Sequence, residues 1–369
     1  MRCFALLIAG LALLAGVAAA VSGGATQAKT RWVITDLGMQ YAFAINDHGQ
    51  IIGLNHGDAV VWESGKLTRL KPLRCRLGRG AWWGSRGWNR PNAINERGQI
   101  VGRCGSDTGP QRAVLWQDGK VIDLGALPHN RYSVAVAIND RGQVVGYSWS
   151  RFSEAHESEP ASVRAFLWEK GKMTNLGTVG GQDSAAVAIN NRGQVVVAVG
   201  DWALRETDAY LWENGRLTRL GPRAGEGEAV DAINDHGQII GQATRANFRS
   251  YAFLWEKGKM IDLGFLDAKD INERGQIVGS GSKTGVLWQD GKKTALGSLS
   301  PSDINDQGQV VGSTSGTGGS TRPVLWQNGT KTALPTLGGK WSGAEAINEH
   351  GQIIGSTGSR YVLWTLPRG

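Results

Sequence analysis

Short runs of β-branched and apolar residues alternate with glycine-containing turn signals along the whole chain. Within residues 185 to 221 this alternation predicts four strands, at 185–189, 194–199, 209–212 and 216–220. The linkers between the first and second strands read Asn-Asp-x-Gly or a variant, and those between the third and fourth read Glu-x-Gly-Lys. Asn and Asp favour type I turns and Gly accepts a left-handed conformation, so both linkers are hairpin signals. The pattern predicts a four-stranded antiparallel meander.

This meander recurs along the sequence. Its first anchor is an asparagine in the phrase Ile-Asn-Asp-x-Gly-Gln, and neighbouring anchors are 33 to 51 residues apart: Asn46, Asn95, Asn139, Asn190, Asn234, Asn272, Asn305 and Asn348. Its second anchor is a tryptophan after an apolar residue: Trp62, Trp116, Trp168, Trp212, Trp255, Trp288, Trp326 and Trp364. The chain therefore contains eight repeats, whose differences in length must lie in loops.

A four-stranded sheet cannot cover both of its faces alone, so the repeats must stack as a propeller or as a solenoid. The last repeat ends near Trp364 without a fourth strand, whereas an unpaired strand precedes the first repeat at 33–38. The eighth blade is complete only if this N-terminal strand joins it, whereas a solenoid would need polar caps instead. The sequence predicts an all-β, eight-bladed propeller at 29–369, with the first strand of each repeat nearest the axis and the N-terminal strand outermost.

One tryptophan at a fixed place in each repeat is typical of packing between blades rather than of chemistry. The glycine of the Gln-x-x-Gly phrase similarly predicts a close backbone approach within a strand. Val197 replaces this glycine in the fourth repeat, which predicts a bulge there. These repeat positions are therefore interpreted as structural.

The first 28 residues are predicted to be a secretory signal, because Arg2 precedes an apolar run and a stretch of small residues. Cleavage is expected after Ala20 or Ala28, and no later stretch approaches the roughly 18 apolar residues that a membrane-spanning helix needs. We therefore expect an exported protein, periplasmic or extracellular. Cys75 and Cys104 are the cysteines left after cleavage, and an oxidising compartment favours a disulfide between them over two separate buried thiols.

The repeat also resembles a known family. The phrases at 137–146, 165–173 and 262–264 (Ala-Ile-Asn-Asp-x-Gly-Gln-Val-Val-Gly, Ala-Phe-Leu-Trp-Glu-x-Gly-Lys-Met and Asp-Leu-Gly) are similar to those of the HAF-type probable extracellular repeat family. The resemblance covers nearly the whole chain after the signal. It implies an exported bacterial repeat protein, but it implies no activity and supplies no catalytic residue.

Propeller geometry puts the long, variable connections on one face, where binding surfaces are usually built. Of the 15 tryptophans, eight are repeat anchors and Trp32 precedes the first strand. The other six are predicted on the variable face and, with nearby arginines, form our candidate site for a ligand that stacks on flat rings. These candidates are Trp82, Trp83, Trp88, Trp149, Trp202, Trp341, Arg76, Arg79 and Arg86. Packing among the long loops remains an alternative role for them.

The chain has 41% hydrophobic and 20% charged residues and a formal net charge of +8, which suits an anionic partner. A glycan, an anionic polymer of the cell envelope or a protein partner is expected rather than nucleic acid, because an exported protein rarely meets nucleic acid first. No nucleophile motif, phosphate loop or metal-ligand spacing is present, so no catalytic residue, metal or cofactor is predicted.

Two functions therefore remain. The first is a monomeric, non-catalytic binding scaffold that uses its Trp and Arg face. The alternative is a polysaccharide-active enzyme with a site at the mouth of the central channel, for which Asp183 with Asp201, or Glu226 with Asp231, are candidate carboxylate pairs. Buried acids with raised pKa values near the axis would favour the enzyme.

Overall fold

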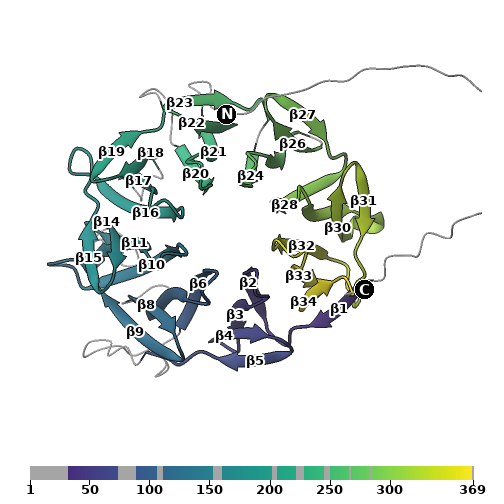
Figure 1. Ribbon diagram of the computed structural model, residues 1–369, viewed down its shortest axis with the longest axis horizontal. Coiled ribbons are helices and arrows are strands. Elements are labelled where there is room, and N and C mark those ends of the chain that lie inside the picture. The colour runs from purple at the N-terminus through teal and green to yellow at the C-terminus, as the bar shows by residue number, and fades with distance from the viewer. Residues whose placement is uncertain are drawn as a thin grey trace, which may run out of the picture. The chain divides into compact units, whose positions relative to one another are not determined.

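The computed structural model describes residues 32–73, 89–105, 111–152, 160–201, 206–221, 228–244, 250–265, 267–282 and 284–367. They form eight four-stranded antiparallel sheets arranged as blades around a central opening (Figure 1). The predicted eight-bladed propeller is therefore confirmed. A two-stranded hairpin, β12 (Arg151–Phe152) with β13 (Pro160–Ala161), and a short 3-10 helix, η1 (Thr317–Gly319), interrupt the connections. No helix among the residues described is long and apolar enough to cross a membrane.

Each blade runs outward from the axis in chain order (Figure 1). The innermost strands are β2 (Tyr41–Ile45), β6 (Asn89–Ile94), β10 (Tyr132–Ile138), β16 (Asp183–Ile189), β20 (Glu228–Ile233), β24 (Asp267–Ile271), β28 (Leu299–Ile304) and β32 (Ser342–Ile347). The second strands are β3 (Ile51–Asn55), β7 (Ile100–Gly105), β11 (Val144–Trp149), β17 (Val195–Asp201), β21 (Ile239–Thr244), β25 (Ile277–Ser280), β29 (Val310–Ser315) and β33 (Ile353–Thr357).

The third strands are β4 (Asp58–Glu63), β8 (Gln111–Gln117), β14 (Arg164–Glu169), β18 (Glu206–Glu213), β22 (Ser250–Glu256), β26 (Gly285–Gln289), β30 (Thr321–Gln327) and β34 (Arg360–Thr365). The outermost strands are β5 (Lys66–Arg69), β9 (Lys120–Gly125), β15 (Lys172–Asn175), β19 (Arg216–Arg219), β23 (Lys259–Asp262), β27 (Lys292–Ala295), β31 (Thr330–Ala333) and β1 (Val33–Asp36). β1 pairs with β34, with Ile34 opposite Trp364, so the N-terminal strand completes the eighth blade as predicted.

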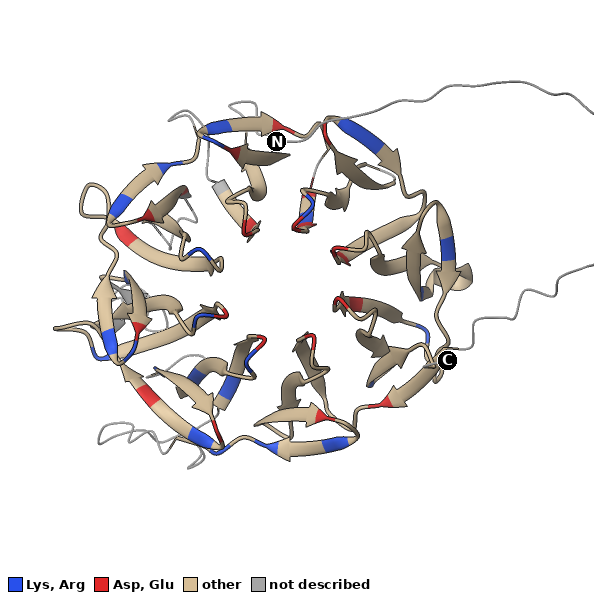
Figure 2. Ribbon diagram, in the orientation of Figure 1, with Lys and Arg blue, Asp and Glu red and all other residues tan. Residues whose placement is uncertain are grey.

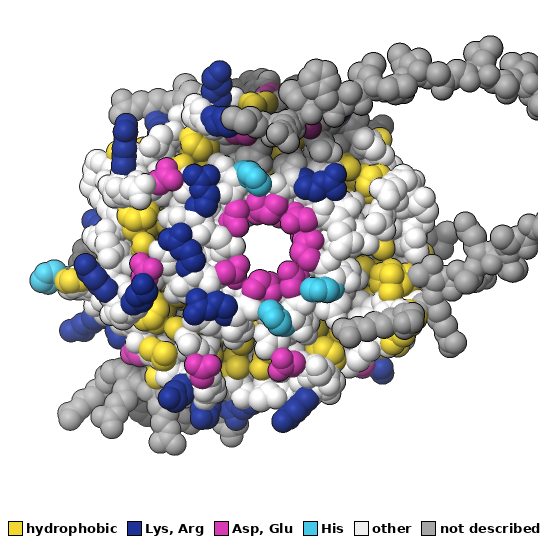
Figure 3. All heavy atoms as spheres, in the orientation of Figure 1, with side chains coloured by type: hydrophobic (Ala, Val, Ile, Leu, Met, Phe, Trp, Pro, Cys, Tyr) yellow, Lys and Arg dark blue, Asp and Glu magenta, His cyan; other side chains and the backbone are white. Residues whose placement is uncertain are grey.

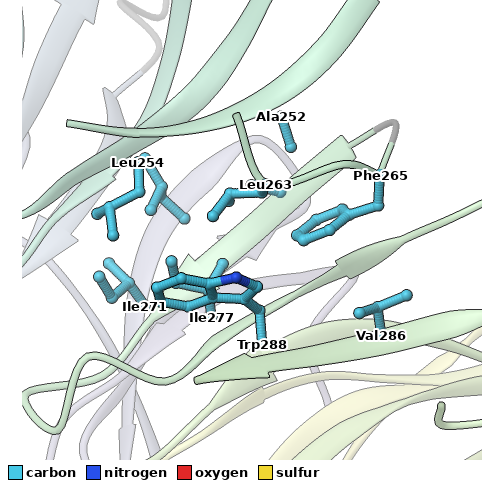
Figure 4. Packing of buried hydrophobic residues seen from close by; sticks show 10 residues of the cluster. Ala252, Leu254, Leu263, Phe265, Ile271, Ile277, Val286 and Trp288 are labelled. Atoms are coloured by element: carbon cyan, nitrogen blue, oxygen red, sulfur yellow. The ribbon is translucent and has the colours of Figure 1, made fainter. Parts of the chain in front are cut away.

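The hydrophobic core is divided among the junctions between blades. At the junction of the fifth and sixth blades, Trp288 packs with Leu254, Ile271 and Ile277, which come from both blades (Figure 4). Six of the eight repeat tryptophans are buried, and the other two, Trp168 and Trp212, pack against equivalent clusters. The repeat tryptophans therefore pack the blades together, as expected.

Every innermost strand carries one extra residue, because its register with the second strand shifts at the same place in all eight blades. Val197 thus does not mark a bulge peculiar to the fourth blade. The shift brings the two strands together at the repeat glycine: a Cβ on Gly146 would lie 1.9 Å from the Val134 carbonyl oxygen. The predicted close backbone approach is confirmed at this glycine.

Candidate functional site

The two faces of the propeller are built differently. The hairpins between first and second strands, and the two-residue turns between third and fourth strands, lie on one face, which we call the hairpin face. In the latter turns both central residues have positive φ, as at Ser64 and Gly65, so they are of type I′ rather than type I. The opposite face, the loop face, holds the connections of variable length and sequence.

A closed circle of hydrogen bonds joins the blades on the hairpin face. The side-chain amide of each repeat asparagine donates to the backbone carbonyl of the repeat asparagine in the next blade, at 2.9 to 3.1 Å. The last bond runs from Asn348 to Asn46, across 302 residues of sequence. All eight asparagines are buried. The hairpins therefore fasten each blade to its neighbour.

A second circle of hydrogen bonds runs beside the first. The residue after each repeat asparagine accepts a hydrogen bond from the equivalent backbone N–H in the preceding blade, at 2.6 to 3.0 Å. Seven of these residues are acidic and one is an amide: Asp47, Glu96, Asp140, Asn191, Asp235, Glu273, Asp306 and Glu349. Figure 3 shows the acidic side chains as a ring around the central opening, and Figure 2 places them at the tips of the innermost strands.

The carboxylate ring is partly desolvated. Burial is the largest cause that raises the pKa values of Glu96, Glu273 and Glu349, and repulsion from neighbouring aspartates adds to it. Hydrogen bonds from the backbone oppose these shifts without cancelling them. At neutral pH the carboxylates of the ring therefore repel one another, although each of them accepts a hydrogen bond that joins two blades.

Asn191 relieves this repulsion at one point, because its amide donates to the carboxylates of Asp140 and Asp235 at 2.9 and 3.1 Å. We expect Asn191→Asp to lower stability by about 1–2 kcal/mol at about pH 7.5, since two donors are lost and a charge is added between two others. Like charges raise the pKa of the new carboxyl group in the folded state, so the stability loss grows as pH rises through that pKa. Thermal unfolding should show a much smaller difference from the wild type at about pH 5.

Asn214→Asp, in the exposed turn between β18 and β19, makes the same chemical change away from the ring. It should leave the unfolding temperature nearly unchanged at both pH values. An Asn191→Asp deficit of equal size at both pH values would contradict the electrostatic account of the ring.

The channel wall carries a second group of acids, on innermost strands of neighbouring blades. Asp270 and Asp303 hydrogen-bond to each other through their side chains, and burial, then the charge of Asp270, raises the pKa of Asp303 well above its ordinary value. Asp303 also accepts from the backbone N–H of Ile347 in the eighth blade, at 2.8 Å. The pair and its bond to Ile347 therefore link three blades. Alanine occupies the equivalent place in the other six repeats: Ala44, Ala93, Ala137, Ala188, Ala232 and Ala346.

Asp231 is the extra residue at the bulge of β20. Its side chain reaches solvent, but the neighbouring protein removes part of its hydration. This partial desolvation, with the charge of Asp267 adding to it, raises the pKa of Asp231 to about 6, while Lys269 opposes the shift. Asp183, another predicted acid, instead pairs with Arg164 at 3.3 Å. Glu226 lies outside the described residues, and nothing is described of the Asp201 side chain, so their predicted pairings stay predictions.

Two of the six tryptophans predicted to bind a ligand, Trp149 and Trp341, lie within the described residues. Trp341 is exposed, with 63% of its surface accessible, on the connection between β31 and β32. Its backbone is fixed, since the Trp341 carbonyl accepts from Gly358 N at 2.8 Å and the Lys340 carbonyl accepts from Thr321 N at 3.0 Å. The Lys340 ammonium group lies 5.2 Å from the centre of the Trp341 ring.

The prediction for Trp149 is wrong. Trp149 is the last residue of β11 and is 2% exposed, packed with Val134 and Val163 and flanked by the rings of Tyr132 and Tyr147. It belongs to the core and offers no surface to a ligand. Eight further predicted residues lie outside the described ranges, where their roles stay predictions: Cys75, Arg76, Arg79, Trp82, Trp83, Arg86, Trp88 and Trp202.

Cys104 is fully buried in β7, and its predicted bridge to Cys75 stays a prediction, because Cys75 is not among the residues described. Within the described ranges, no group of three or more His, Cys, Asp or Glu side chains is arranged to hold a metal ion.

No family model matches the chain, and no curated protein does, so the resemblance to the HAF-type repeat family stays a prediction. Solved structures do match. One is a prolyl endopeptidase, at 11% identity and a TM-score of 0.52, over 83% of this chain and 50% of that one. Another is a puromycin-hydrolysing peptidase from Mycobacterium tuberculosis, at 14% identity and a TM-score of 0.46, over 88% and 56%.

The β-propeller domain of the Trilobed protease from Pyrococcus furiosus matches at 12% identity and a TM-score of 0.44, over 75% of this chain and 95% of that one. The chain spans only about half the length of the two peptidases above. At these identities the comparisons show the propeller fold and nothing about activity.

Proposed function

We propose that the protein is an exported, non-catalytic binding scaffold that recognises a glycan through its loop face. The observation that carries the proposal is Trp341, a large aromatic side chain that is exposed on a connection whose backbone is pinned. A flat ring that is already in place loses little conformational entropy when it stacks on a sugar, so such rings are efficient binding groups.

The division between the two faces supports the same proposal. On the hairpin face, backbone groups and carboxylates are engaged in the two circles of hydrogen bonds described above. The loop face carries the variable connections, and variable loops on a rigid scaffold are the usual place for recognition. Two other classes of ligand could bind to this face: an anionic envelope polymer and a protein partner.

The test is binding of the mature protein to a glycan array and to acidic polysaccharides, at low and high salt. We expect Trp341→Ala to weaken glycan binding at least about fivefold, as loss of one stacked ring is worth about 1–3 kcal/mol. A triple variant, Trp82→Ala/Trp83→Ala/Trp88→Ala, tests the predicted contribution of the insertion. Ile122→Ala, which removes an exposed apolar side chain from the outermost strand β9, is the matched control.

Binding that is lost in high salt but survives Trp341→Ala would favour an anionic polymer held by charge. Absence of binding to every polysaccharide would contradict the glycan proposal and favour a protein partner.

A second function is favoured by a specific observation: the channel wall holds acids with raised pKa values, Asp231 at about 6 and Asp303 beside Asp270. One protonated and one ionised carboxyl group are what a glycosidase or lyase needs. Release of reducing ends from a polysaccharide panel, abolished in Asp231→Asn and retained in Asp58→Asn on the third strand β4, would support this enzyme. Activity that persists in Asp231→Asn would contradict it.

A further inference from the structure

Three aromatic rings meet where the eighth blade joins the first, a junction that we call the seam. Tyr41 begins β2 at the loop face and is 52% exposed. Its ring is nearly parallel to that of Phe43, with an interplanar angle of 7° and 6.5 Å between centroids. The ring of Tyr361, from β34 of the eighth blade, lies 6.0 Å from Tyr41 at 56°. The seam thus supports one widely exposed ring with two partly buried ones.

Groups of opposite charge flank these rings. The guanidinium carbon of Arg90, at the start of β6 in the second blade, lies 5.0 Å from the Phe43 centroid. On the other side, Glu345 of β32 is exposed and hydrogen-bonds with Ser356. Glu345 is also close enough to Tyr361 for its charge to add to burial in raising the pKa of the Tyr361 phenol. An aromatic platform with a hydrogen-bond donor and an acceptor beside it is therefore assembled from three blades.

The bulges of the innermost strands show how the channel wall changes in character at the seam. The extra residue of each bulge lies on the strand that borders the central opening, in the order Phe43, Asn92, Val136, Val187, Asp231, Lys269, Ser302 and Glu345. The first four are uncharged and partly buried, whereas the last four are polar and exposed. Phe43 and Glu345 are neighbours across the seam, where the uncharged half of the wall meets the polar half.

We propose that the seam binds one uncharged sugar residue of a glycan, with the face of the sugar ring on Tyr41 and its hydroxyl groups hydrogen-bonded to Glu345 and Arg90. The proposal rests on the glycan-binding function above and adds the position and the charge of the bound unit. An acidic sugar is disfavoured, because the Glu345 side chain lies close enough to these rings for its negative charge to act on Tyr361, and it would repel a second negative charge there. A neutral sugar can instead use both charged groups through its hydroxyls.

The test is titration calorimetry of the mature protein with cellohexaose, chitohexaose and maltohexaose as uncharged probes and hexagalacturonate as the acidic probe. We expect at least one uncharged hexasaccharide to bind, and the Kd to rise at least about fivefold in Tyr41→Ala and about threefold or less in Tyr41→Phe, which keeps the ring. Glu345→Gln should also weaken binding, by about three- to tenfold. Ile261→Ala, which removes an exposed side chain of β23, should leave the Kd unchanged.

The outcomes separate this proposal from the function on which it rests. If a glycan binds and loses affinity in Trp341→Ala but not in Tyr41→Ala, the seam proposal is overturned and the binding scaffold stands. Preference for hexagalacturonate over every uncharged probe would overturn the predicted charge of the bound unit. Failure of all probes and of the glycan array would overturn both.

Discussion

Replacing Asn95 with aspartate is expected to lower the free energy of unfolding by about 3–5 kcal/mol, because one oxygen of a buried carboxylate would face two hydrogen-bond acceptors. The Asn95 amide donates to the carbonyl of Asn139 in the next blade at 2.9 Å and to Gln99 Oε1 at 2.8 Å. An aspartate would point an oxygen at both of these acceptors. Its other oxygen would still accept from the backbone N–H groups of Arg97 and Gln99, so the hairpin itself would keep its local bonds.

Denaturant unfolding at neutral pH measures this loss. Asn328→Asp is the matched control, since it makes the same change in an exposed turn between β30 and β31 and should shift the free energy by no more than about 0.5 kcal/mol. If the two variants unfold at the same denaturant concentration, the circle of asparagine bonds does not hold the blades together.

The architecture could be predicted because the sequence of each repeat contains the signals for its own strands and turns. Turn signals at Asn46 and Gly49, a tryptophan at Trp62 and an apolar alternation between them recur eight times, and a strand without a partner at 33–38 indicated how the ring closes. Local propensity and pairing agree in every blade, so the strand order and the outermost position of β1 were predicted correctly. The bounds differ by a few residues: the strand predicted at 209–212 is Glu206–Glu213.

The circles of bonds between blades could not be predicted in the same way. Each bond spans 33 residues or more, and neither partner is identifiable until the blades are placed side by side. A signal was nevertheless present, since the residue after each repeat asparagine always carries a side-chain oxygen, as in Asp47, Glu96 and Asn191. A turn alone would accept many other residues there, so a fixed chemical type indicates a further partner.

The bulges account for the residues that sequence reasoning missed. Strict alternation predicts which side chains of a strand share a face, but one extra residue changes the assignment for the rest of the strand. Phe43 and Glu345 lie at bulges, and Asp303 follows one. The only sequence signal for Asp270 and Asp303 was their departure from the Ala-Ile-Asn phrase. Trp149 was misplaced for a different reason: β11 continues farther than its pattern suggested, so a presumed loop residue ends a strand and packs into the core.

The same construction explains why recognition should be confined to one face. Each hairpin on the hairpin face uses its polar groups to bind the next blade, and a change there alters the stability of the whole ring. On the loop face, Tyr41 and Trp341 belong to neighbouring blades and their exposed rings can change without breaking a bond between blades. Stability and binding are therefore expected to respond to different substitutions.

Gly146→Ala is expected to cost about 3 kcal/mol or more, because no room exists for a single methyl group. A Cβ at this position would lie 1.9 Å from the Val134 carbonyl oxygen and 3.1 Å from the Ala135 Cα. Both obstacles are backbone atoms of the paired strand β10, so no side chain can rotate away. Relief requires the two strands to separate at the bulge, which would weaken their hydrogen bonds. Thermal and denaturant unfolding measure the effect.

Gly343→Ala is the matched control, since a Cβ there meets only Ser313 Cβ at 3.7 Å and the backbone has no positive φ. It should be neutral or slightly stabilising, by reducing the entropy of the unfolded chain. The fourth blade accepts Val197 at the position equivalent to Gly146, with the same register shift opposite it. A Gly146→Ala protein as stable as the wild type would contradict this prediction. It would mean that the third blade can accept a side chain at this position, as the fourth blade accepts Val197, and that the fold does not require the close approach of the two strands.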